Sequence, residues 1–428
     1  MSKQNGLTGL YVSPVLAYVI TILLFIFQGL NFFDKLSFGV SALPIMHEYG
    51  LNFKQFGLIG ATFFLFFAVG GTFVGIVFSG RFKPKHILLG LALVWTISQL
   101  PIAMTHSLYI LIACRLLLGL GEGGALAVAL TAAYEWFPAE RRNFPNSIIL
   151  QGISYGFLIG GPFLSFLVHD FGWRSCFLAC GLLSLIWLIV YAIIAREGPY
   201  ARYQPVVNEQ EKPLPFRVLW FDRSVIGVSL VLLFAYWVVG MAAIWLPPFL
   251  RLALGYRTIQ AGWIISAIYI AQSPILLLGG WLSQYMNKRG WNIRLTLGWG
   301  SGLAMLVSGT ALILAVISPL GVVQIVFLAL AFSVPSLTTI FCPVILSIVS
   351  PVCQRARLMV VLISVTSISA FFSTLINGWI IQAYPDEVKY GFSLAFGLGG
   401  VVLLIGSLCA FFLLFPEATI KRFATYKK

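Results

Sequence analysis

Twelve runs of predominantly apolar residues divide the chain, and this pattern constrains the fold more strongly than any other feature. A helix needs about 20 apolar residues to cross the hydrocarbon core of a bilayer, where its backbone must satisfy its own hydrogen bonds. Short segments with charge, Pro or Gly separate the runs, as in GRFKPKH at 80–86. The runs fall roughly at 15–45, 56–79, 87–104, 108–133, 147–168, 175–195, 224–250, 261–285, 294–316, 322–349, 358–383 and 391–415.

A shortage of charge supports the same conclusion. Of the 428 residues, 60% are hydrophobic and only 9% are charged, against about 25% in a soluble domain. These charged side chains are too few to cover a water-facing surface, which excludes a soluble enzyme, a disordered protein and a nucleic-acid-binding protein. We therefore expect an all-α, multi-pass membrane protein of 12 transmembrane helices.

The one long break between runs lies near the middle of the chain, at 196–223. It predicts two pseudo-symmetric six-helix bundles, 1–195 and 224–428, joined by a polar linker. A basic loop follows the second run of each half, SGRFKPK and SQYMNKRG, which suggests a duplicated unit. Transporters are commonly built from such repeats, with the substrate site at the midplane between them. Arg81, Lys288 and Arg289 in these two loops are candidate gating residues.

The distribution of Lys and Arg predicts the orientation, because basic residues gather in cytoplasmic loops. If the N-terminus is cytoplasmic, 20 of the 27 basic residues fall in cytoplasmic segments and five in outer loops. The other two, Lys35 and Arg115, lie inside runs. Both termini are thus expected in the cytoplasm, and the net charge of +14 is a topology signal that needs no nucleic-acid partner.

Four ionisable residues interrupt the apolar runs of the first half: Asp34, Lys35, Arg115 and Glu122. A charge at mid-bilayer costs about 2.5–3.5 kcal/mol on insertion scales, so each must face a partner or a water-filled cavity. Arg115 and Glu122 share a helix face, since seven residues make two turns. One interpretation is a carboxylate pair that takes up protons beside two cations that hold an anionic substrate. The alternative is a static ion-pair network between two helices.

Neutral polar and aromatic residues within the runs are further candidates for substrate contact, with helix–helix hydrogen bonding as the alternative for each. They are Asn31, Gln151, Tyr155, Tyr236, Trp237, Gln272, Ser336 and Asn377. The six cysteines show no disulfide or metal-ligand spacing, and no catalytic triad, zinc motif or phosphate-binding loop is present. We therefore expect no enzyme, metal or cofactor, and transport driven by an ion gradient.

Six segments carry the motifs of a known family: LNFFDKLSFGVSALP (30–44), RLLLGLGEGG (115–124), YEWFPAERR (134–142), GGPFLSFLVHDFGWRSCF (160–177), IWLPPFL (244–250) and GGWLSQYMNKRGWN (279–292). In this order they resemble the major facilitator superfamily, and within it the anion:cation symporter group. That group includes sugar-acid, phthalate and tartrate transporters and sialin-type carriers. The resemblance implies the major facilitator fold and alternating access.

The resemblance also implies roles for the four charged residues. Asp34 and Glu122 match the family's proton-coupling carboxylates, and Arg115 matches the arginine that pairs with the second of them. Lys35 stands where the family has an arginine that grips the substrate's carboxylate, so a point charge replaces a planar fork. These matches predict proton-coupled uptake of an organic anion, with Na⁺ as the alternative ion and a proton-coupled exporter as the alternative transporter. A membrane sensor or enzyme is the alternative of another class.

The chain departs from the family at several positions. The Asp of a conserved D-R pair in the cytoplasmic loops is missing from both halves, so gating is expected to differ. Sugar-acid members carry Tyr, Gln and Asn where Ala68, Ile153 and Ser367 align. Their loss favours a carboxylate that is less hydroxylated, larger or more aromatic than a sugar acid. The fold family implies a monomer, and the short loops without an N-x-S/T sequon favour a bacterial inner membrane.

Overall fold

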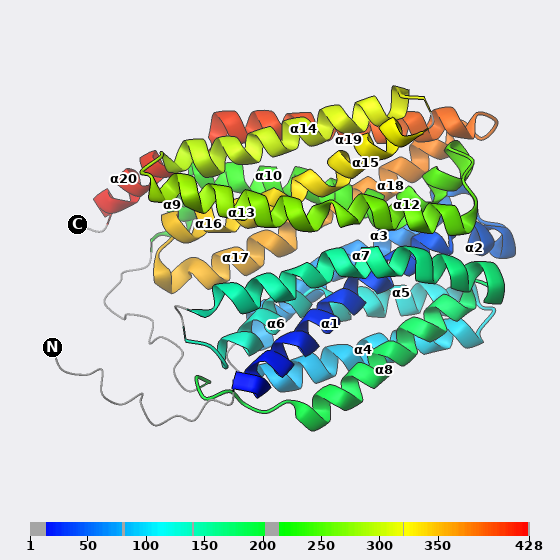
Figure 1. Ribbon diagram of the computed structural model, residues 1–428, viewed down its shortest axis with the longest axis horizontal. Helices are drawn as coiled ribbons and strands as arrows, with labels where there is room; N and C mark the ends of the chain where they lie inside the picture. The colour runs from blue at the N-terminus through cyan, green and yellow to red at the C-terminus, as the bar shows by residue number, and fades with distance from the viewer. Residues whose placement is uncertain (1–13, 79–81, 139–140, 202–213, 320, 427–428) are drawn as a thin grey trace.

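The computed structural model describes residues 14–78, 82–138, 141–201, 214–319 and 321–426, and every regular element in these ranges is a helix. Twelve helices or helix pairs are long and apolar enough to cross a membrane, as predicted. In Figure 1 the helices of the first half, which run from blue (α1) to green (α8), lie below those of the second, which run from green (α10) to red (α20). Helix α1 begins and α20 ends at the same end of the bundle, here called the terminal end. Which side of the membrane this end faces stays a prediction.

The first half contains eight α-helices and one π-helical turn, η1, which extends α3. Their bounds are α1 (Pro14–Val40), α2 (Ala42–Tyr49), α3 (Phe53–Phe73), η1 (Val74–Phe78), α4 (Pro84–Met104), α5 (Leu108–Glu122), α6 (Ala125–Tyr134), α7 (Asn143–Phe171) and α8 (Arg174–Ile194).

The remaining helices begin in the predicted linker and continue through the second half. Their bounds are α9 (Phe216–Trp220), α10 (Arg223–Gly240), η3 (Met241–Trp245), α11 (Leu246–Pro248), η4 (Phe249–Ala253), α12 (Thr258–Ile270), α13 (Gln272–Lys288), η5 (Arg294–Trp299), α14 (Gly300–Ile317), α15 (Val322–Ser333), η6 (Val334–Leu337), α16 (Thr338–Val349), α17 (Val352–Thr366), α18 (Ile368–Gln382), α19 (Val388–Leu413) and α20 (Pro416–Tyr426).

Several runs that the sequence presents as single helices are interrupted near their middle. The fourth span changes from α5 to α6 at a turn formed by Gly123 and Gly124, directly after Glu122. The tenth span passes from α15 to α16 through η6, a 3₁₀ segment that contains Pro335. Non-regular backbone at membrane depth is tolerated where it is buried in protein or lines a cavity. We therefore expect a substrate site near the middle of the spans, at the depth of these breaks.

Glycines allow the two halves to approach closely at the end of the bundle opposite the termini. A Cβ built on Gly39 of α1 would lie 2.1 Å from the carbonyl oxygen of Ala243 in η3. Gly161 of α7 and Gly262 of α12 face each other, and a Cβ on either would lie within 2.6 Å of the other's carbonyl oxygen. Small residues permit such backbone contact between membrane helices. The halves are therefore packed together at this end.

A polar network at the same end ties α2 to α8 within the first half. The guanidinium of Arg174 donates to both carboxylate oxygens of Glu48, over 2.8 and 2.5 Å, and Trp173 Nε1 donates to the same carboxylate over 2.9 Å. The hydrogen bonds from Arg174 lower the pKa of Glu48 to about 2. The F-G-W-R segment thus has a structural role in fixing the loop before α8.

The close approach of α7 and α12 predicts that Gly161→Ala lowers the thermal unfolding midpoint of the purified protein. The added methyl group has no room beside Gly262, and overpacking of this kind costs about 1–3 kcal/mol. Gly397→Ala in α19 is the matched control, because a Cβ there meets nothing within 4 Å. An unchanged midpoint for Gly161→Ala would contradict the packing described here.

Candidate functional site

A cavity of about 240 Å³ lies between the two halves. Side chains from α1, α3 and α7 line it on one side, and side chains from α10, α12, α13 and η6 line it on the other. The lining extends to Ser147, near the start of α7, so the cavity reaches toward the terminal end of the bundle. The breaks at η6 and between α12 and α13 both border it. This is the position expected for a transporter's substrate site.

Of the described residues that line this cavity, one is charged, Lys35 of α1. Its ammonium group forms a buried ion pair with Glu122 at the last residue of α5. It also donates to Asn31 Oδ1 over 2.5 Å, and Nζ lies 4.6 and 5.0 Å from the ring centroids of Phe32 and Phe67. The cation is therefore held by a carboxylate on one side and faces aromatic rings on the other. Breaking such a buried pair leaves an uncompensated charge.

Arg115 lies deeper in the first half and is fully buried. Its guanidinium packs against Phe38 and Phe63, with the central carbon 4.5 and 4.6 Å from the ring centroids. Within the described ranges its three nitrogens have no hydrogen-bond partner. The pair between Arg115 and Glu122 implied by the resemblance is therefore absent there, and Lys35 takes the carboxylate. Seven residues separate the two by about 10.5 Å along α5, so they share a helix face without being adjacent, and Glu122 pairs across to α1 instead.

Asp34 points away from the cavity, toward α4 and α8, where Gln99 and Cys180 are its neighbours. The residue is completely buried, and among the described residues neither carboxylate oxygen has a hydrogen-bond partner of good geometry. A buried carboxylate without a partner is costly as an anion. A proton on Asp34 removes this cost, so the side chain is suited to carry one.

The predicted neutral contacts divide into two groups. Gln151, Tyr236, Gln272 and Ser336 line the cavity together with Lys35. Asn31 does not line the cavity itself, but its side-chain oxygen accepts a hydrogen bond from Lys35, which does. The other three lie elsewhere: Tyr155 is 41% exposed on the outer side of α7, and Trp237 and Asn377 are buried away from the cavity.

The two predicted gating residues that the structure describes, Lys288 and Arg289, lie outside the cavity as well. Arg81 falls outside the described residues. Lys288 and Arg289 are exposed at the end of α13, where Arg289 packs over the ring of Tyr285 at 4.6 Å.

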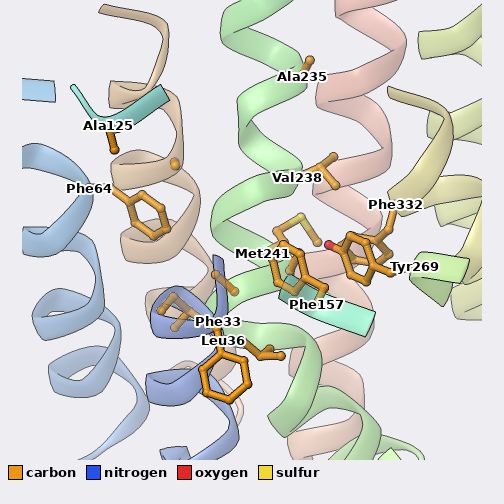
Figure 2. Close-up of a cluster of buried hydrophobic side chains, with 14 of the residues drawn as sticks. Phe33, Leu36, Phe64, Ala125, Phe157, Ala235, Val238, Met241, Tyr269 and Phe332 are labelled. Carbon is orange, nitrogen blue, oxygen red and sulfur yellow. The ribbon is translucent and has the colours of Figure 1, made fainter. Parts of the chain in front are cut away.

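Apart from Tyr236, the aromatic lining was not predicted from the sequence. Phe157 of α7 and Tyr269 of α12 stack across the two halves, with ring centroids 4.1 Å apart and planes at 7°. Figure 2 shows this pair at the level of Met241 and Phe332, between Val238 on one side and Leu36 on the other. A signal was available, because Phe32 stands three residues before Lys35 and so shares its helix face. The other aromatic lining residues are Phe64, Phe67, Tyr236 and Phe332.

A family model and the sequences of known proteins both identify this chain as similar to membrane transporters. The family model of the Major Facilitator Superfamily matches residues 24–350. The probable sulfoacetate transporter SauU of Cupriavidus necator is 27% identical over 402 residues, 89% of this chain and 90% of that protein. The hexuronate transporter of Bacillus subtilis is 25% identical over 276 residues, 63% of this chain and 65% of that protein.

Two solved structures share the fold. A bacterial homologue of the human lysosomal transporter Spinster, in an inward-facing and unoccupied conformation, superposes with a TM-score of 0.77 at 18% identity, over 96% of this chain and 98% of that one. The D-xylose-proton symporter superposes with a TM-score of 0.74 at 16% identity, over 94% of this chain and 99% of that one.

The buried pair predicts that Lys35→Met and Glu122→Gln each lower the thermal midpoint, because either change leaves the partner's charge or polar group uncompensated at a cost of about 3–5 kcal/mol. The double variant should lose less than the sum of the two single losses. Lys389→Met, at an exposed lysine, is the control and should leave the midpoint unchanged. Strictly additive losses would show that the two side chains are not coupled.

Proposed function

We propose that the chain, which belongs to the Major Facilitator Superfamily, is a secondary transporter that takes up an organic anion, a carboxylate, together with protons. The observation that carries the proposal is the pairing of Lys35, the one charged residue among the described residues that line the cavity, with the buried carboxylate of Glu122. The cation that would bind the ligand, Lys35, and the carboxylate that would accept the proton, Glu122, are thus paired with each other. Binding of an anion to Lys35 therefore affects the protonation of Glu122, and protonation of Glu122 affects anion binding.

The first step of the mechanism is protonation of Glu122 while the cavity faces outward. Neutralising this carboxylate releases the ammonium group of Lys35 from its ion pair. Protonation of Glu122 therefore adds one positive charge to the cluster of Asp34, Lys35, Arg115 and Glu122. An organic monoanion that binds Lys35 offsets this added charge inside the membrane, where an uncompensated charge is costly.

The second step is the change to the state that opens at the terminal end. The contacts between Gly39 and Ala243 and between Gly161 and Gly262 close the opposite end in that state. When Glu122 loses its proton to the cytoplasm, it competes with the substrate for Lys35 and displaces it. Asp34 offers a second proton site, separated from the cavity.

The relatives support an anion as the substrate. The similar proteins are described as transporters of sulfoacetate and of hexuronates, which are small organic acids. We place the protein in a bacterial inner membrane as a monomer with both termini in the cytoplasm. The proposed ion is H⁺, because the coupling groups are carboxylates beside cations, and Na⁺ remains the alternative.

This mechanism predicts that Glu122→Gln abolishes accumulation of substrate driven by a proton gradient in proteoliposomes. The variant mimics the protonated state permanently, so exchange of labelled for unlabelled substrate should continue. Asp386→Asn, at an exposed acid far from the cavity, is the control and should accumulate normally.

Two outcomes would overturn the coupling role. Accumulation by Glu122→Gln at the wild-type level would show that this carboxylate does not couple transport to protons. Wild-type accumulation that follows a Na⁺ gradient and ignores a proton gradient would assign the coupling to sodium.

A further inference from the structure

We infer that the substrate is a monocarboxylate whose body is a single aromatic ring on a short arm, such as phenylacetate or 3-phenylpropionate. The inference rests on the proposed function and narrows its substrate class. It differs from what the names of the relatives suggest, since sulfoacetate is a small dianion and hexuronates are polyhydroxylated.

The charge available to a ligand favours a monoanion. Among the described residues that line the cavity, Lys35 is the only charged side chain. Arg115 is fully buried and separated from the lining by Phe63, whose ring it contacts. A dianion would bring one charge that no cavity cation meets, and a buried charge without a partner is strongly unfavourable.

The walls of the cavity favour an aromatic body. Phe32 and Phe67 face the ammonium group of Lys35, so a carboxylate bound there places its adjoining carbon atoms against rings. Phe32 in turn lies edge-on to Phe157 at 5.6 Å, and Phe157 stacks on Tyr269 (Figure 2). Aromatic rings prefer such edge and offset contacts with one another. If the carboxylate of a ligand is bound to Lys35, the ring of that ligand would add one more contact to this series of aromatic rings.

The serine and threonine hydroxyl groups that line the cavity already donate to the backbone, which disfavours a polyol. Thr339 and Ser367 donate to carbonyl oxygens of their own segments, at Ser336 and Ser364, over 2.6 Å. Ser147 likewise donates to the carbonyl of Phe144 over 2.8 Å. A sugar acid needs a partner for each hydroxyl group that it buries, and these donors are committed to the backbone.

Two glutamine side chains retain donors for a few polar atoms. Gln272 Oε1 accepts from Ser154 over 3.0 Å, and Gln151 Oε1 accepts from Ser273 over 2.7 Å. These bonds fix the amides across the two halves and leave their NH₂ groups as donors at the cavity wall. The volume of 240 Å³ lies below the range of about 300–1,000 Å³ typical of drug-sized ligands, in keeping with one ring and a short arm.

The test is a binding measurement on the full-length purified protein at mildly acidic pH, with a panel of matched probes. Phenylacetate and 3-phenylpropionate represent the inferred class, sulfoacetate the dianions and glucuronate the polyhydroxylated acids. 2-Phenylethanol and phenethylamine carry the same ring without a negative charge. We expect the two aryl monocarboxylates to bind at least about tenfold more tightly than every other probe, a difference of about 1.4 kcal/mol.

The outcomes separate this inference from the proposed function. Tighter binding of sulfoacetate or glucuronate would overturn the aromatic monocarboxylate and leave anion transport in place. Binding of 2-phenylethanol or phenethylamine in preference to every anion would overturn both.

Two variants locate the effect in the cavity. Phe157→Leu keeps an apolar side chain but removes the ring, and it should weaken phenylacetate binding about two- to tenfold. Phe166→Leu, at an exposed position of the same helix, should leave binding unchanged. Equal affinity in both variants and in the wild type would contradict a ring contact at Phe157.

Discussion

The buried ion pair between Lys35 and Glu122 determines what the rest of this structure can do. Two charges inside a membrane protein are tolerated because each compensates the other, and the removal of either charge by a proton or a ligand changes the free energy of both. The cavity gives a ligand access to one member of the pair only, because Lys35 lines it and Glu122 does not. If the substrate is a carboxylate, as we propose, it competes with Glu122 for Lys35.

The fold supplies what such a competition needs in order to drive transport. Glycine contacts seal the halves at the end opposite the termini, and the cavity reaches toward the terminal end. The helix breaks at η6 and between α12 and α13 border the cavity, where the backbone need not be lipid-exposed. A shift of one half against the other would close the terminal end and open the opposite end, while the pair of Lys35 and Glu122 stays at the midplane.

The sequence predicts this fold well because the bilayer imposes a length and a hydropathy on every span. It also identifies the four charged residues, since a charge in an apolar run is costly wherever it lies. It does not predict their partners: the spacing of Arg115 and Glu122 specifies a common face, whereas the pair with Lys35 depends on how α1 packs against the fourth span, which it contacts along α6. Phe157 and Phe67 could not be predicted as lining residues, because in the sequence they do not differ from the other apolar residues of a membrane helix. Only the packing of the two halves distinguishes them.

The central claim is that anion binding and protonation of the carboxylates are one event. It is tested most directly by the number of protons that the purified wild-type protein takes up when the tightest-binding carboxylate binds. Titration calorimetry in buffers of different ionisation enthalpy gives this number. At mildly alkaline pH, where the ion pair is intact, we expect uptake of about one proton per anion bound, because Glu122 must be neutralised to release Lys35. Saturable binding with no proton uptake at any pH would contradict the account.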